Sequence, residues 1–427
     1  MSRVPLVMGV AVVGSGISLL CAAALLERGP FSSAHIWLGF GVYASLGASA
    51  WWAHWTERSR VARGVLGIVW LAASTEGLFQ LLAVGKTIPG VSVRSPTPFG
   101  RVYWTKEGGN QGVLNRYGWH GHRADFSGSG TRVVLIGDSF VEALEVSRTR
   151  NMGAQLEDHL PNHEVISLGR GATGPGHYLE TLRYALDVYQ PETVVLSFFL
   201  GNDFTDSFGD GEVRPRLEHE LLYQLDTAER LVVAPESPLT PERYRFRLHY
   251  NHFLTPLTLA RTLASHHLTL GLATDLWNRP AGMLAPPPPK EVVEQGLPKM
   301  RVSDRASMRL ALALLQQAHQ EAQDHGVALT VVTIPHVPAQ SEVHAPDFVV
   351  DMTEYGLLLD EQELAQGLRK RGIPVLDLGR QLAERHPTVA DLHAFYIDGH
   401  GHLTTSGHGW VAREICTHLF AACQEDQ

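Results

Sequence analysis

Three long apolar stretches open the chain, and they cover residues 4–26, 36–55 and 65–84. Each is close to the roughly 20 residues that a helix needs to cross the hydrocarbon core of a bilayer. The first stretch is too long for the apolar core of a signal peptide, and no small-x-small cleavage site ends it. We therefore expect three transmembrane helices within residues 1–90. Glu76 lies inside the third stretch, and we expect it to face a neighbouring helix.

The charges between these stretches predict their orientation. The loop between the second and third stretches carries Arg58, Arg60 and Arg63, whereas the loop before it carries only Glu27 and Arg28. Loops rich in arginine and lysine stay in the cytoplasm. The pattern therefore predicts a multi-pass protein of a bacterial inner membrane. Everything after residue 84 is expected on the periplasmic, extracytoplasmic side.

From about residue 131, short apolar runs alternate with helical patterns. The runs lack polar alternation, which is typical of strands buried on both faces of a parallel sheet. The expected strands cover residues 132–136, 164–168, 193–200, 328–334 and 374–378, and the expected helices cover residues 141–159, 177–188, 304–325, 361–371 and 407–423. This alternation predicts an α/β sandwich with right-handed crossovers, in which ligands bind at the carboxyl ends of the strands.

The alternation stops over residues 204–301. This segment holds a helical pattern near residues 241–272 and a run of four prolines at 286–289. We interpret it as an insertion over the active-site face, either a lid or a substrate platform. The expected organisation is a membrane anchor over residues 1–90, a lead-in segment over 91–130 and a catalytic domain over 131–427.

Charge and cysteine content narrow the classes of partner. The formal net charge is −9 with no basic patch, which argues against a nucleic-acid partner. Cys416 and Cys423 fall on one expected helix at a separation of roughly 10 Å, which is too far for a disulfide unless the helix unwinds. The remaining cysteine, Cys21, lies in an apolar run, and no cysteine-rich zinc pattern exists. The sequence predicts neither a metal nor a cofactor.

Ser139 stands at a position suited to a nucleophile. Residues 137–140 read Gly-Asp-Ser-Phe, and they come between an expected strand and an expected helix. Backbone N–H groups point at such a position and favour a developing negative charge. The alternative interpretation is an ordinary N-cap serine.

Two further motifs carry groups that a serine nucleophile needs. Residues 201–203 read Gly-Asn-Asp at the end of the third expected strand, where the Asn202 amide can donate to an oxyanion. Asp398 and His402 lie in one short loop before the last expected helix, where a carboxylate can orient a histidine base. The alternatives are a Gly-Asn-Asp turn and a surface loop rich in glycine and histidine.

The order of these motifs resembles that of the SGNH (GDSL-like) hydrolase superfamily. The resemblance covers about residue 115 to the C-terminus apart from the insertion, and residues 115–119 and 140–144 also resemble bacterial members. It implies a flavodoxin-like three-layer α/β/α sandwich and ester hydrolysis through an acyl-serine. The oxyanion would be held by the Ser139 N–H, a backbone N–H of a second glycine-rich block, and Asn202.

The chain departs from the family pattern in two places. The second block usually reads Asn-x-Gly-x-x-Gly-x-Gly, whereas residues 167–174 read Ser-Leu-Gly-Arg-Gly-Ala-Thr-Gly, which puts Ala172 at the oxyanion glycine. The family usually has its aspartate two or three residues before the catalytic histidine, but Asp398 lies four before His402. We prefer Asp398 with His402. His400 is the alternative base, and a His402 without a carboxylate partner is a third possibility.

The sequence as a whole predicts an extracytoplasmic serine esterase. Its expected substrate is an O-acetyl or other short acyl ester on a cell-surface glycan. One rival is an O-acyltransferase that passes the acyl group from the same serine to a glycan hydroxyl. Another is a non-catalytic protein that binds or assembles glycans. A metal site built from Asp398, His400, His402 and His408 is disfavoured because it would leave the nucleophile block without a purpose.

Overall fold

The computed structural model describes residues 50–51, 54–55, 59–84, 92–94, 96–128, 130–208, 220–250, 304–337, 349, 357–386, 388–399, 401–420 and 423. The chain divides into two compact units. The first comprises Met1–Gly118 and Leu254–Lys290, and the second comprises Trp119–Phe253 and Glu291–Gln427. The first two apolar stretches fall outside the described residues, except for a few positions between 50 and 55.

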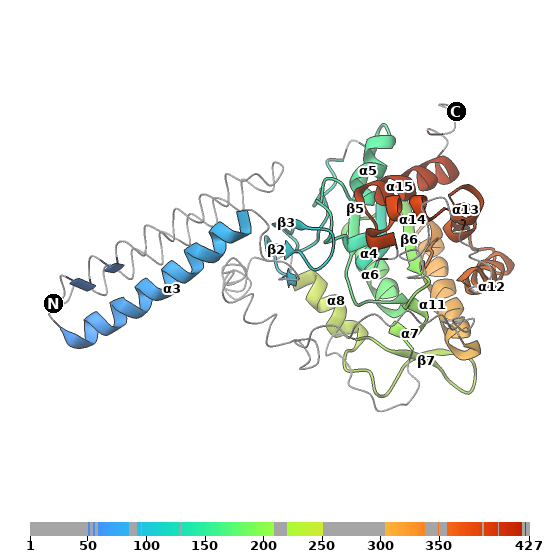
Figure 1. The fold of residues 1–427 in the computed structure, drawn as a ribbon. Coiled ribbons are helices and arrows are strands. Elements are labelled where there is room, and N and C mark those ends of the chain that lie inside the picture. The colour runs from blue at the N-terminus through green and yellow to red at the C-terminus, as the bar shows by residue number, and fades with distance from the viewer. Residues whose placement is uncertain are drawn as a thin grey trace, which may run out of the picture. The chain divides into compact units, whose positions relative to one another are not determined.

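The first unit contains the long apolar helix α3 (Arg60–Val84) (Figure 1). Its segment Arg60–Leu78 is long and apolar enough to cross a membrane, and it is the single candidate span within the described residues. Large apolar side chains lie exposed along it, namely Val61, Val65, Ile68, Leu71 and Leu78. Glu76 is buried, with 3% of its surface exposed. An apolar exposed surface of this kind is suited to contact with lipid.

A three-stranded antiparallel sheet follows α3 in the first unit. It consists of β1 (Ser92–Arg94), β2 (Arg101–Trp104) and β3 (Asn110–Val113), paired in that order. The buried side chains of Val102 and Tyr103 form part of its core. This sheet was not predicted, because strands of only three or four residues show no clear pattern of apolar positions.

The second unit is built on a five-stranded sheet in which all neighbours are parallel. Its strands are β4 (Thr131–Gly137), β5 (His163–Gly169), β6 (Thr193–Phe199), β9 (Ala328–Ile334) and β10 (Val375–Asp377). They are ordered β10-β9-β6-β4-β5. Numbered along the chain within this sheet, the order is 2-1-3-4-5 from the β5 edge, which is the flavodoxin-like arrangement. The predicted α/β class and parallel sheet are confirmed.

Helices cover both faces of this sheet (Figure 1). The described helices of the second unit are α4 (Ser139–Glu142), α5 (Met152–His159), α6 (Pro175–Val188), α7 (Asp203–Asp206), α8 (Pro241–Tyr250), α11 (Arg305–Asp324), α12 (Leu357–Lys370), α13 (Leu378–Arg385), α14 (Val389–Phe395) and α15 (Thr405–Leu419). The side chains of Val133 and Leu135 join one apolar core with α5, α13, α14 and α15. The intervening Val134 and Ile136 point to the other face, as strand alternation requires, and are fully buried there.

The long helix predicted over residues 141–159 is wrong. The chain forms the single turn α4, leaves it at Ala143 in the left-handed conformation (φ 54°), and starts α5 only at Met152. Asn151 begins the second helix because its side chain accepts a hydrogen bond from the Ala154 N–H at 3.0 Å.

The described part of the insertion packs on α6. It comprises the hairpin of β7 (Tyr223–Leu225) and β8 (Leu231–Val233), followed by α8. Glu180 of α6 is fully buried, accepts a hydrogen bond from the Tyr223 hydroxyl at 2.9 Å, and pairs with Arg183 and Arg245. This buried carboxylate ties β7 and α8 to the sheet's helical layer. Residues 209–219 and 251–303 lie outside the described residues.

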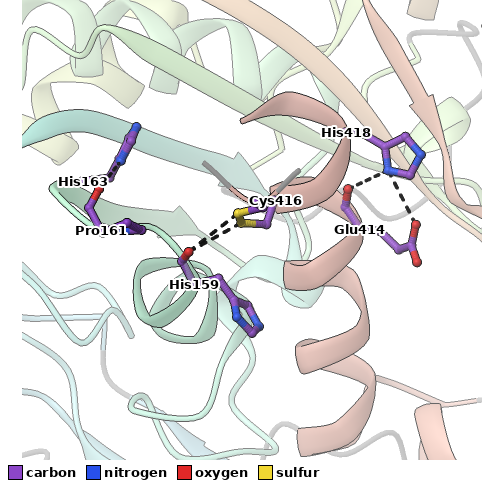
Figure 2. Close-up of a disulfide and its surroundings, with 7 residues drawn as sticks. His159, Pro161, His163, Glu414, Cys416 and His418 are labelled. Atoms are coloured by element: carbon purple, nitrogen blue, oxygen red, sulfur yellow. Dashed lines mark hydrogen bonds and ion pairs between the residues drawn. A yellow bond between two sulfur atoms is a disulfide. The ribbon is translucent and has the colours of Figure 1, made fainter. Parts of the chain in front are cut away.

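The prediction that Cys416 and Cys423 lie on one continuous helix, which would keep them from bonding, is wrong. Helix α15 ends at Leu419, and Phe420 continues in an extended conformation. The Cα atoms of Cys416 and Cys423 lie 5.7 Å apart, a distance that allows a disulfide. The sulfurs of Cys416 and Cys423 lie 3.7 and 3.6 Å from the carbonyl oxygen of His159 (Figure 2).

Candidate active site

Ser139 lies directly beyond the carboxyl end of β4, the strand between β5 and β6. This is the point at which the strand order reverses, where ligands bind in flavodoxin-like sheets. Asp138 caps α4, because its side chain accepts a hydrogen bond from the Phe140 N–H at 3.0 Å. Since α4 is only one turn long, its dipole is smaller than the sequence predicted, and the individual N–H groups matter more.

His402 contacts the hydroxyl of Ser139. The distance from His402 Nε2 to Ser139 Oγ is 2.9 Å, and the two residues are 263 positions apart in the sequence. The imidazole also lies against the Phe140 ring, with ring centroids 5.0 Å apart. A histidine in this position can accept the serine proton.

The loop that carries His402 is closed by backbone contacts. The Ile397 N–H donates to the carbonyl oxygen of His402 at 2.8 Å, and Tyr396 forms an antiparallel bridge with Leu403. The 3₁₀ turn η3 (Ile397–Gly399) lies within this loop. These contacts fix the backbone of His402 before α15 begins, so the position of its ring does not depend on the helix alone.

Asp398 is not joined to His402 by any contact that the structure shows. Its backbone is left-handed (φ 52°), its side chain is exposed, and it makes no hydrogen bond or ion pair with the described part of the chain. His400, the alternative base, lies outside the described residues.

Ala172 follows β5 in a left-handed conformation, with φ at 59°. This is a backbone geometry that favours glycine, which is the residue that the resemblance leads one to expect at this position. The preceding N–H, that of Gly171, donates to the Glu142 carboxylate at 2.7 Å. Glu142 therefore ties the loop after β5 to the end of α4. Arg170, in the same loop, lies over the Trp119 ring at 4.9 Å.

Asn202 follows β6 and precedes α7. Its Nδ2 donates to Asp206 Oδ2 at 2.6 Å, while its Oδ1 is buried and accepts no hydrogen bond from the described residues. Asn202 and Ala172 thus follow the two strands that flank β4. No contact of either residue with the Ser139 side chain is seen in the described chain.

Buried carboxyl groups surround the nucleophile. Burial raises the pKa of Asp138 to about 6, although the Phe140 N–H and nearby His402 act in the opposite direction. Burial, followed by the nearby charges of Asp138 and Asp206, also raises the pKa of Asp203. The Tyr178 hydroxyl donates to Asp203 at 2.9 Å. Burial thus disfavours the charged form of both carboxyl groups, and the charge of Asp138 disfavours ionisation of Asp203 further.

Several supporting residues were missed by the sequence argument. His408 is fully buried in α15, and its Nε2 lies 3.0 Å from Glu145 Oε1. This contact gives His408 a structural role, and Glu145 was not foreseen as its partner. Glu142 and Asp206 were missed as well, because a carboxylate that accepts a hydrogen bond from a loop has no sequence signature of its own.

No protein-family model and no curated protein matches the chain. Among solved structures, it is similar to a member of the lipolytic protein G-D-S-L family from Veillonella parvula (9% identity, 68% of this chain and 100% of that chain, TM-score 0.33). It is also similar to the lipase/acylhydrolase from Enterococcus faecalis (12% identity, 67% of this chain and 93% of that chain, TM-score 0.33). A third similar structure is a mutant of Axe2, an acetyl-xylooligosaccharide esterase from a Geobacillus (10% identity, 68% of this chain and 94% of that chain, TM-score 0.31). At TM-scores below 0.5, these likenesses add nothing to what the strand order and the contacts establish.

Proposed function

We propose that this chain is a membrane-anchored serine esterase of the SGNH (GDSL-like) superfamily, with Ser139 as nucleophile and His402 as general base. The observation that carries the proposal is the 2.9 Å contact between Ser139 Oγ and His402 Nε2. It joins the two motifs in a pairing that acyl transfer through serine requires.

In the proposed reaction, His402 Nε2 takes the Ser139 proton while Oγ attacks the ester carbonyl carbon. The resulting oxyanion is held by the backbone N–H groups of Ser139 and Ala172 and by the side-chain amide of Asn202. When the intermediate collapses, the C–O bond to the alcohol breaks and the departing alcohol takes the proton from His402. A water molecule then attacks the acyl-serine by the same route, which releases the acid and restores Ser139.

The proposed substrate is an O-acetyl or other short acyl ester on a cell-surface glycan, acted on outside the cytoplasm. Two observations support this location. Helix α3 is apolar enough to cross a membrane, and the Cys416–Cys423 disulfide is typical of an oxidising compartment. Transfer of the acyl group to a glycan hydroxyl would use the same residues up to the acyl-serine. Only a product assay with an acceptor glycan present separates the two reactions.

Labelling with a fluorophosphonate probe tests the proposal without knowledge of the substrate. The purified full chain is compared with Ser139→Ala, His402→Ala and His400→Ala. We expect labelling of the wild type, its loss in Ser139→Ala and His402→Ala, and its retention in His400→Ala. Loss in His400→Ala with retention in His402→Ala would move the base to His400. A folded wild type that is never labelled would favour a non-catalytic glycan-binding protein.

The role of Asp398 remains a separate prediction, because it rests on the order of residues in the sequence. Asp398→Asn removes the charge while keeping the shape of the side chain. A large drop in labelling rate would show that Asp398 orients His402 during the reaction. An unchanged rate would show that His402 acts without it.

A further inference from the structure

The carboxylate of Asp206 lies where it can control the amide of Asn202. Asp206 is four residues after Asn202 on the short helix α7, and its Oδ2 accepts a hydrogen bond from Asn202 Nδ2 at 2.6 Å. Asn202 Oδ1 is buried and accepts no hydrogen bond from the described chain. The contact with Asp206 is therefore what distinguishes the two ends of this amide.

The distinction matters because the two ends of an asparagine amide are nearly equal in size and opposite in function. An NH₂ group stabilises an oxyanion, whereas a carbonyl oxygen in the same place would repel it. A carboxylate accepts hydrogen bonds and cannot donate them, so the Asp206 contact holds the NH₂ end in place. The amide has two N–H bonds, and this contact uses only one of them.

Asp206 is itself held against the loop that follows β5. A Cβ atom on Gly174 would lie 2.8 Å from the Cβ of Asp206, so only glycine permits this approach. The neighbouring Ser207 Oγ accepts a hydrogen bond from the Gly176 N–H at 2.8 Å. The segment that carries Ala172 and the turn that carries Asn202 are therefore joined through Asp206 and Ser207.

We infer that Asp206 is a positioning residue for the oxyanion hole, which keeps the NH₂ end of Asn202 turned toward the nucleophile and fixes it relative to the loop of Ala172. The inference rests on the proposed function, since it concerns the same oxyanion hole. It assigns Asp206 a role through Asn202 and no contact with substrate.

A double-mutant cycle on the fluorophosphonate labelling rate tests this role. Removal of an oxyanion donor slows acyl transfer by about 100-fold or more, and we expect Asn202→Ala to behave in this way. Asp206→Ala is expected to slow labelling about 10-fold, and Asp206→Asn to stay near wild type because its side-chain oxygen still accepts from Asn202. The double variant Asn202→Ala/Asp206→Ala should label at the rate of Asn202→Ala alone, because Asp206 then has no amide to hold.

Asp187→Ala on α6 is the matched control, since this aspartate is 73% exposed and is expected to leave the rate unchanged. Thermal unfolding of each variant confirms that it is folded. Gly174→Ala probes the same contact from the other side and should also slow labelling. Losses that multiply in the double variant would overturn the inference while leaving the proposed function intact. An unlabelled wild type would overturn both.

Discussion

The substitution Ala172→Gly is the sharpest test of the loop that follows β5, because the backbone of Ala172 lies in a region that alanine rarely adopts. A residue with a Cβ atom costs roughly 1–2 kcal/mol in the left-handed region, and glycine avoids this cost. The side chain of Ala172 is exposed, so its removal sacrifices little packing. The greater freedom of glycine in the unfolded chain offsets roughly 0.4–1 kcal/mol of the gain. Ala172→Gly should therefore stabilise the protein by roughly 0.5–1 kcal/mol.

The assay is thermal unfolding of the full chain in detergent, where a gain of this size raises Tm by about 2 °C. Ala394→Gly is the control, because Ala394 is exposed on α14 and the same substitution there should cost about 1 kcal/mol. The labelling rate should stay within about threefold of wild type, since the donor is a backbone N–H. If Ala172→Gly lowered Tm as the control does, the left-handed backbone at Ala172 would be refuted, together with the loop geometry that depends on it.

Three other substitutions test the surroundings of the site. Burial raises the pKa of Asp138 from 3.8 to about 6, so the folded state tolerates the neutral carboxyl better than the charged one. The contribution of Asp138 to the free energy of unfolding is therefore largest below pH 3.8 and is lost as the pH rises through 6. Asp138→Asn should therefore be more stable than wild type by up to about 3 kcal/mol at pH 8 and equal to it near pH 3, as thermal unfolding across pH would show. Glu142→Ala should slow fluorophosphonate labelling about 10-fold by releasing the loop N–H, whereas Glu142→Gln keeps an acceptor and should restore the rate. Cys423→Ser should lower stability by about 2 kcal/mol, and mass spectrometry after alkylation should find Cys416 free only in that variant.

The sheet was predictable because the two faces of its strands are both buried. Such strands need unbroken apolar runs, and the segments 132–136 and 328–334 lie within β4 and β9 as the structure has them. Helix boundaries were less predictable where local side-chain contacts decide them. The stretch after Ser139 has helical periodicity throughout, but the left-handed turn at Ala143 and the cap at Asn151 divide it. The same limit explains the missed disulfide, since α15 stops short of Cys423.

The pairing of Ser139 with His402 could be anticipated because each lies in a motif with a recognisable order in the chain. The residues around them could not be anticipated. Glu142 meets the loop after β5 only because that loop returns to the end of α4, and Asp206 meets Gly174 only because β5 and β6 flank β4. Contacts of this kind depend on which strand lies beside which, and a pattern along one chain does not specify that.

The exposed position of Asp398 limits how much its carboxylate can accelerate a reaction in which His402 is the base. A carboxylate in water interacts with a nearby cation by at most about 1 kcal/mol, which corresponds to about a fivefold change in rate. A buried carboxylate bonded to the base of a serine triad contributes far more, about 10⁴-fold in a well-studied protease. With Asp398 exposed, its carboxylate can contribute little to the proposed reaction in this arrangement. The effect of Asp398→Asn therefore measures whether the loop over residues 397–402 rearranges when substrate binds. A loss well above fivefold requires Asp398 to move against His402, and a smaller loss means that the exposed arrangement is the one that reacts.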